Sequence, residues 1–382
     1  MSKEKKKKKF PWKTVVMILL FLCGAFAGGW FIGKVLDPII DELPPEQFFP
    51  GLLGVYIVLF GGSFLHTVIH EAGHLVFGLL TGYQYSSFRI GSFMWVKYEG
   101  KISLKRHTLA GTGGQCLMAP PDMEDGKVPY VLYNLGGCIV NFIVSVIPLV
   151  FVIIFWQPTY FNFMVILWAV IGLFVFFTNG IPMKVQGMPN DGHNALSLGK
   201  NPKALQAFWL QMKIVEQISF GKRLRDLPAE WFEMPEEEDM QNSLIATIAV
   251  FACNRLVDSG KYEEAAKEME RLVKKKSGIV GIHKHLLNMD RIYCEMVGEN
   301  HPEKLEELYT DELKKVLKAM KKSPSTHRLQ YLYAKYVEKD EKKAADAMAM
   351  FEKVAKTYPY PHEIDGEREM IRYAEERLQT NL

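Results

Sequence analysis

The sequence predicts a mainly α-helical protein with two parts. The first is a polytopic transmembrane helical domain of about four spans with a short β-hairpin, and the second is a C-terminal soluble α-helical domain. Two observations support this prediction. Apolar runs long enough to cross a bilayer occur only in the first half of the chain. After Asn194 the sequence becomes charged, and its apolar residues recur with helical spacing. We therefore divide the chain into residues 1–49, 50–195, 196–240 and 241–382.

The composition excludes some classes of function. The formal net charge is only +3, and a basic excess is concentrated in the run KEKKKKK near the N-terminus. Such a run indicates membrane topology rather than nucleic-acid binding. The five cysteines are isolated, so the sequence predicts neither a disulfide framework nor a cysteine zinc site. A reducing cytosol fits the soluble half.

The N-terminal region contains the first predicted span. Thr14–Gly33 is an apolar run of about the length that crosses a membrane. Ala25-Phe26-Ala27 offers a signal-peptide cleavage pattern, but the run continues to Ile32 and favours an uncleaved anchor. The loop Lys34–Phe49 is acidic rather than basic, so the positive-inside rule places it outside the cytoplasm.

A metal-ligand pattern lies within the second apolar run, Pro50–Gly82, where Glu71 is the only formal charge. A helix carries His70 and His74 on one face, so their ring nitrogens can bind one cation. The H-E-x-x-H pattern is typical of zinc metalloproteases, in which the glutamate acts as general base and a third ligand comes from elsewhere. Ionisable groups at membrane depth are costly and indicate function. The alternatives are core histidines, or a haem or metal-transport site that includes His66.

Residues 83–130 are too polar to span a membrane as a whole. Two β-prone segments, SSFRIGSFMWVKY and ISLKRHTL, flank Glu99-Gly100-Lys101 and predict a hairpin. Basic residues, Arg89 among them, indicate a cytoplasmic location. Gly113-Gly114 and Pro120-Pro121 are expected to end the strand pattern.

Val131–Trp156 and Tyr160–Gly180 complete the four predicted spans and place the N- and C-termini in the cytoplasm. The next segment is rich in Asn, Gly and Pro, so the helix should stop there. Asp191 lies in it, near the depth inferred for the zinc motif. A carboxylate completes many two-histidine zinc sites. On spacing alone a turn or N-cap role for Asp191 is favoured, and His193 is a rival ligand.

Three elements of residues 50–195 occur in a characteristic order: His70–His74 in one span, Gly137–Asn141 in the next, and Asn179–Pro182 followed by Asp191-Gly192. In this order and topology the chain resembles the site-2 protease family of intramembrane zinc metalloproteases. The chain departs from that family at Cys138, where proline often follows the glycine. Asp191 also lies farther from Pro182 than in the commonest form.

The resemblance implies a Zn²⁺ site with His70, His74 and Asp191 as ligands and Glu71 as general base. It also implies that Asn141 donates a hydrogen bond to the substrate backbone or the developing oxyanion. A polar contact between membrane helices is the alternative for Asn141. The implied activity is regulated intramembrane proteolysis. The substrate helix must unwind locally, because its own hydrogen bonds shield its peptide bonds.

The soluble half is helical in pattern. Pro202–Phe220 is amphipathic, which suits a helix on the inner membrane surface or a packed soluble helix. Ser259–Ala266 resembles the Gly-x-Tyr-x-x-Ala pattern of tetratricopeptide-like helix pairs. Stacked pairs are expected at about 243–276, 280–321 and 325–357. A plain helical bundle is the alternative, and either offers a docking surface for a cytoplasmic protein.

We therefore expect a multi-pass cell-membrane zinc endopeptidase that acts on a membrane protein or peptide and contacts the lipid bilayer. The alternative is a membrane-anchored helical-repeat adaptor with a structural or degenerate metal site. The two hypotheses differ at Glu71, because a purely structural site has no use for a base. A third hypothesis, a histidine-lined transporter, predicts that His66→Ala eliminates metal binding.

Overall fold

The computed structural model describes residues 45–379 except 109–111, 158, 186 and 275–276, together with residues 26, 29–30, 33–34 and 37. The N-terminal lysine run lies outside the described residues. Almost all of the first predicted span also lies outside them. The predictions of an uncleaved anchor or a signal peptide therefore concern residues outside the described part of the chain. The described part of the chain is mainly helical and contains one four-stranded sheet and one short two-stranded sheet.

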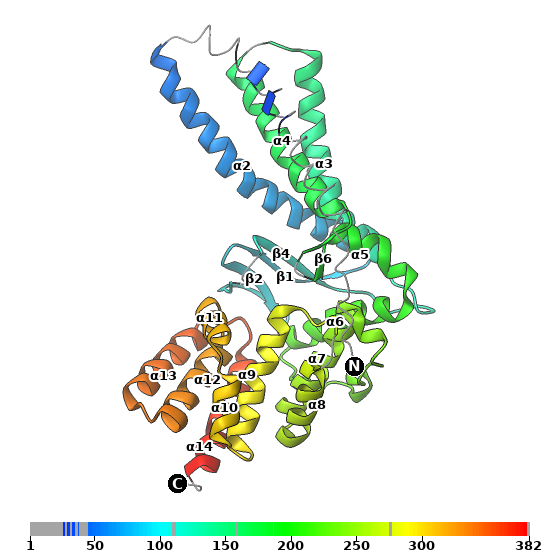
Figure 1. The fold of residues 1–382 in the computed structure, drawn as a ribbon. Coiled ribbons are helices and arrows are strands. Elements are labelled where there is room, and N and C mark those ends of the chain that lie inside the picture. Colours follow the sequence, from blue (N-terminus) through cyan, green and yellow to red (C-terminus); the bar gives the residue numbers. More distant parts are fainter. Residues whose placement is uncertain are drawn as a thin grey trace, which may run out of the picture. The chain divides into compact units, whose positions relative to one another are not determined.

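Within the described residues, three helices are long and apolar enough to cross a membrane: α2 (Pro45–Leu80), α3 (Tyr130–Ile154) and α4 (Tyr160–Gly180) (Figure 1). They coincide with the second, third and fourth predicted spans. Helix α2 begins at Pro45, inside the segment expected to be a loop. Proline suits a helix start, because the first N–H groups of a helix have no partner within it.

Contacts divide the chain into two compact units, residues 1–65 with 142–174 and residues 66–141 with 175–382. The first unit has a small core of Val152, Phe163 and Ile166. Many of its apolar side chains are exposed, with Phe60 at 73% and Phe161 at 70%. Apolar surface of this extent marks a contact with lipid or with another protein.

The second unit contains a sheet of β1 (Gln84–Ile90), β2 (Phe93–Tyr98), β3 (Lys101–Arg106) and β4 (Gly114–Ala119). The strands are antiparallel in the order β3-β2-β1-β4. The predicted hairpin is β2–β3, and its turn residues Glu99 and Gly100 both have positive φ, as tight hairpins require.

Strand β4 is not predicted by the sequence, because Gly113-Gly114 is a pattern typical of a break. Gly114 instead begins the strand. The strand, GQCLMA, lacks β-branched residues, so it has little local strand propensity. Its pairing with β1 forms it instead.

After α4 the chain forms β5 (Lys184–Val185), β6 (Met188–Pro189), α5 (Asp191–Ser197) and α6 (Pro202–Ser219). Leu205 and Phe208 of α6 are buried in one core with Cys116 and Met118 of β4 and Ile245 of the following helix. Of the two predictions for α6, the packed helix therefore matches the structure, since its apolar residues lie inside the protein.

The remaining helices share one core. They are α7 (Ser243–Asp258), α8 (Tyr262–Lys274), α9 (Gly281–Val297), α10 (Pro302–Leu308), α11 (Asp311–Ala319), α12 (Pro324–Tyr333), α13 (Glu341–Ala355) and α14 (Pro361–Gln379). Helix α14 packs back on earlier helices: Tyr293 of α9 donates to the Met370 carbonyl at 2.9 Å, and the rings of Tyr262 and Tyr373 lie 4.9 Å apart. Repeats of an open solenoid contact only their neighbours. These contacts favour the bundle alternative, and tetratricopeptide-like stacking stays a prediction.

Candidate metal centre

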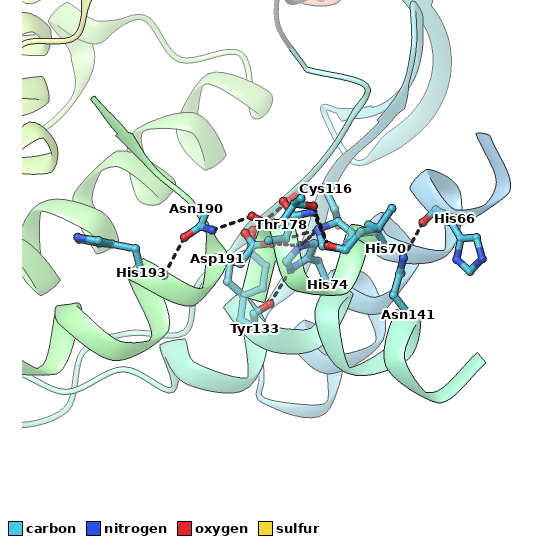
Figure 2. A network of polar contacts seen from close by, with 12 residues as sticks. His66, His70, His74, Cys116, Tyr133, Asn141, Thr178, Asn190, Asp191 and His193 are labelled. Atoms are coloured by element: carbon cyan, nitrogen blue, oxygen red, sulfur yellow. Dashed lines mark hydrogen bonds and ion pairs between the residues drawn. The ribbon is translucent and has the colours of Figure 1, made fainter. Parts of the chain in front are cut away.

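The structure brings together the three residues expected to bind metal. Asp191 Oδ2 lies 3.1 Å from His70 Nε2 and 3.4 Å from His74 Nε2, and the two imidazole nitrogens are 3.2 Å apart. Figure 2 shows these side chains converging from α2 and the start of α5. All three belong to the second compact unit, although Asp191 follows His74 by more than a hundred residues.

These separations fit a tetrahedral metal ion. Ligand atoms that lie 2.0–2.2 Å from zinc in a tetrahedral site are about 3.3–3.5 Å from one another. The measured 3.1–3.4 Å is close to this value. Two imidazoles and one carboxylate form a donor set that leaves a fourth position open, which distinguishes catalytic from structural zinc sites.

Both histidines are oriented by helix α3. Nδ1 of His74 lies 2.8 Å from the backbone carbonyl of Tyr133 and donates a proton there, which orients Nε2 toward Asp191 and the position of a metal. At His70, a Cβ on Gly137 would lie 2.6 Å from the imidazole. Gly137 therefore makes room for that ring, which gives a physical reason for glycine in the Gly137–Asn141 element.

Asp191 is placed by its neighbour Asn190, the N-cap of α5. Oδ1 of Asn190 accepts from the backbone amides of Met183 and His193, both at 3.0 Å. Its Nδ2 donates to the carbonyls of Thr178 at 3.0 Å and Ile181 at 2.7 Å. One side chain thus ties the end of α4, the following loop and the start of α5 to each other.

The charge state of Asp191 follows from the same contacts. Burial acts to raise the pKa of Asp191, but hydrogen bonds with His70 and His74 outweigh it and hold the pKa well below its usual value. The carboxylate is therefore anionic at neutral pH and available as a metal ligand.

Glu71, the expected base, is 8% exposed and contacts the sheet. Its carboxylate accepts a hydrogen bond from the backbone amide of Cys116 in β4. A Cβ on Gly114 would lie 2.6 Å from Glu71 Oε1, so the strand fits closely against this side chain. Strand β4 is also bonded to helix α3, because the hydroxyl of Tyr133 donates to the Cys116 carbonyl at 2.9 Å.

Asn141 lies apart from the cluster. Its Nδ2 donates to the backbone carbonyl of His66 at 3.3 Å, a contact between α3 and α2 (Figure 2). This bond is the interhelical alternative considered above, and a role for Asn141 toward substrate stays a prediction. His193, the rival ligand, has Nδ1 3.0 Å from Ser197 Oγ, and Figure 2 shows its ring pointing away from Asp191.

Sequence reasoning missed one buried cation near this centre. Charge alone marks Arg89 as part of the cytoplasmic basic excess, yet it is 1% exposed. It donates to the carbonyl of Gly91 at 2.8 Å, to that of Gly114 at 3.2 Å, and to the hydroxyl of Thr112. Arg89 thereby fixes the segment that leads into β4. No local pattern reveals this role, because two of the three partners, Thr112 and Gly114, are distant in sequence.

A second group of potential ligands in the described residues is Glu295, Glu299 and His301. Lys304 lies 2.7 Å from Glu295, and His301 Nδ1 lies 2.9 Å from it. The chain itself therefore balances that carboxylate, and we treat the group as an ion-pair cluster.

Comparison of the chain with models of known protein families, with curated proteins and with solved structures gave no match.

Proposed function

We propose that this chain is an intramembrane zinc metalloprotease of the site-2 protease type. It hydrolyses a peptide bond in or near a transmembrane segment of a membrane protein or peptide. One observation carries the proposal: three donor atoms of His70, His74 and Asp191 lie within 3.4 Å of one another, with Glu71 beside them on a membrane-length helix.

The chain's residues supply the parts that hydrolysis needs. A bound Zn²⁺ supplies Lewis acidity, which lowers the pKa of a water molecule toward about 7. Glu71 accepts the proton of the attacking water and returns it to the leaving amine. The Cys116 amide and the close fit of Gly114 restrict where the Glu71 carboxylate can lie. Asn141 donates to the substrate backbone once that backbone replaces the His66 carbonyl as its acceptor.

The position of the site suits a substrate that is partly embedded in lipid. His74 precedes the end of α2 at Leu80 by six residues, or about 9 Å of helix. A peptide bond near the end of a substrate helix is easier to expose than one at its centre, because fewer helical hydrogen bonds must break. We place this end of α2 and both termini on the cytoplasmic side, where α7–α14 offer a docking surface for a protein partner.

Glu71→Gln tests the proposal. The substitution keeps the size of the side chain and leaves all three metal donors in place, so zinc content and thermal stability should not change. Loss of a general base should slow cleavage of membrane peptides by about 10²–10⁴-fold. The readout is cleavage of transmembrane peptides by purified enzyme in vesicles, with Glu46→Gln on the same helix as the matched control.

Undiminished cleavage by Glu71→Gln would contradict the mechanism. An absence of cleavage by both forms, with zinc bound, would favour the membrane-anchored adaptor. Comparing membrane peptides from cells that carry the active form or Glu71→Gln would then identify the substrate.

A further inference from the structure

Strand β3 is held at both ends by the C-terminal helices. Beside its start, the ring of Tyr98, the last residue of β2 and the partner of Lys101, stacks on His362 of α14 at 5.8 Å. Just beyond its end, Lys322 Nζ donates to Thr108 Oγ1 at 2.8 Å. Among the described residues β3 pairs only with β2, so it forms one edge of the sheet. The β2–β3 hairpin is therefore fixed at two points, and no described strand pairs with the outer edge of β3 between them.

A groove of about 260 Å³ lies between these two points. Its lining is Tyr98, Glu99, Lys101, Ser103, Lys105, Pro359 and Pro361. Lys101, Ser103 and Lys105 alternate along β3 and so face the groove together. Ile102 and Leu104 lie on the opposite face of the strand, and both are exposed.

The charge of the groove is unbalanced. Two lysines and one glutamate line it, and among the described residues no carboxylate forms an ion pair with Lys101 or Lys105. The facing wall contains Pro359 and Pro361, whose nitrogens carry no hydrogen to donate. A chain lying in the groove therefore finds its backbone partners on β3 and its countercharges on the two lysines.

We propose that this groove binds an extended, acidic segment of the membrane substrate; this rests on the proposed function. Four residues of strand separate Lys101 from Lys105, a distance of about 13 Å. Two acidic residues four positions apart in an extended segment match this spacing. A helical segment does not, because four residues of helix rise only about 6 Å.

The sheet connects the groove to the metal centre. The opposite edge strand, β4, contacts Glu71 through Cys116 and Gly114. Three strand spacings of about 4.8 Å separate the two edges, or about 14 Å in all. Four or five extended residues cover that distance, so a segment held at β3 lies within reach of a scissile bond at Glu71.

The test measures binding without cleavage. The full-length Glu71→Gln protein is placed in lipid nanodiscs, and the probe is a fluorescein-labelled peptide of alternating Glu and Val. Fluorescence anisotropy gives its Kd, and the same peptide with Gln in place of Glu measures the contribution of charge. Reversing both groove charges, Lys101→Glu with Lys105→Glu, should raise the Kd of the acidic peptide at least tenfold. Added salt should weaken binding, because the charges are near the surface.

Lys97→Glu is the matched control, because Lys97 pairs with Ile102 and so lies on the opposite face of the sheet. It should leave the Kd unchanged. Equal affinity in the groove variant and its parent, or equal binding of the Gln peptide, would overturn the proposal. If the acidic peptide binds through the groove but the wild-type protein cleaves no substrate, the proposed function is wrong, and the groove remains a binding site for an acidic segment. If the two groove substitutions leave the cleavage of membrane substrates unchanged, the proposed role of the groove is wrong and the proposed function stands.

Discussion

Asp191 and Glu367 are both carboxylates withdrawn largely from water, with 23% and 18% of their side-chain surface exposed. Their neighbouring side chains differ. Glu367 forms an ion pair with Arg328, which is 2% exposed and also lies 2.9 Å from Asp290. Asp191 faces two imidazoles, and the three facing atoms are of types that can bind a metal ion together. A cluster that contains its own permanent cation is structural, whereas a cluster of such ligand atoms can take up a cation from outside, which is the metal ion that we propose.

A third carboxylate, the partly buried Glu363, completes the comparison. It lies one turn before Glu367 on α14, and burial raises its pKa to about 7, although a hydrogen bond from Tyr358 acts in the opposite direction. Here a bound proton, rather than a neighbouring cation, neutralises the carboxylate. An arginine and a proton are thus two ways by which this chain accommodates a buried acid, and the metal ion that we propose at Asp191 is a third.

The largest effect is expected at Asp191. Asp191→Asn removes the negative charge from the donor set, so zinc affinity should fall by more than the 10–100-fold that loss of a supporting hydrogen bond costs, by about a thousandfold. Competition with a chelating dye measures it. Asp239→Asn, which breaks a surface ion pair with Lys203, is the control and should bind zinc normally. Equal affinities would show that Asp191 is not a ligand.

The next largest effect is expected at Arg328. Arg328→Met leaves Glu367 and Asp290 without their cation, which should lower the free energy of unfolding by about 3–5 kcal/mol. Denaturant unfolding of the C-terminal helices in the full-length protein measures it. Zinc affinity of the folded protein should not change. Adding Glu367→Gln should restore part of the loss, and a double variant no more stable than the single one would contradict this account.

A pH-dependent effect of about 3 kcal/mol is expected at Glu363, since a tenfold change in an acid dissociation constant corresponds to about 1.4 kcal/mol. Its pKa is raised from 4.5 to about 7 in the folded protein, so between these values the folded state holds a proton that the unfolded state has released. Stability should therefore fall as pH rises from about 4.5 to 7. Glu363→Gln cannot ionise and should lack this loss. Parallel stability profiles for the two proteins between pH 4.5 and 8 would disprove the assignment.

The smallest effect is expected at Asn190, which touches no metal donor through its side chain. Asn190→Ala removes four hydrogen bonds that position Asp191, and zinc affinity should fall by about 10–100-fold. Asn190→Asp keeps the two acceptor bonds and loses the two donor bonds, so its affinity should lie between those of Asn190→Ala and the wild type. If the Asn190→Ala variant binds zinc as tightly as the wild type, contacts other than those of Asn190 position Asp191.

Local spacing predicts part of this architecture. His70 and His74 follow from helical periodicity, and the three membrane-length helices follow from apolar run length. Asp191 lies in the Asn, Gly and Pro-rich segment that ends the last span at the depth inferred for the histidines, but spacing alone favours a turn or N-cap role, and its prediction as a ligand rests on the family resemblance.

What the sequence does not predict depends on contacts between distant residues. The bond from Cys116 to Glu71 requires β4, which has little strand propensity of its own and forms by pairing with β1. Arg89 is buried because its guanidinium is satisfied by the nearby Gly91 carbonyl and by two groups distant in sequence, Thr112 and Gly114, whereas charge alone marks it as exposed. No pattern of neighbours along the chain carries this information.

The contact between α2 and α3 has an evolutionary consequence. Gly73 and Gly136 each touch the other's backbone so closely that a methyl group on either would collide with it, and Gly137 borders the His70 ring. Even alanine would separate the two helices and move the imidazole. These three glycines should therefore tolerate substitution as poorly as the histidines do, and a survey of viable variants would single them out although they carry no reactive group.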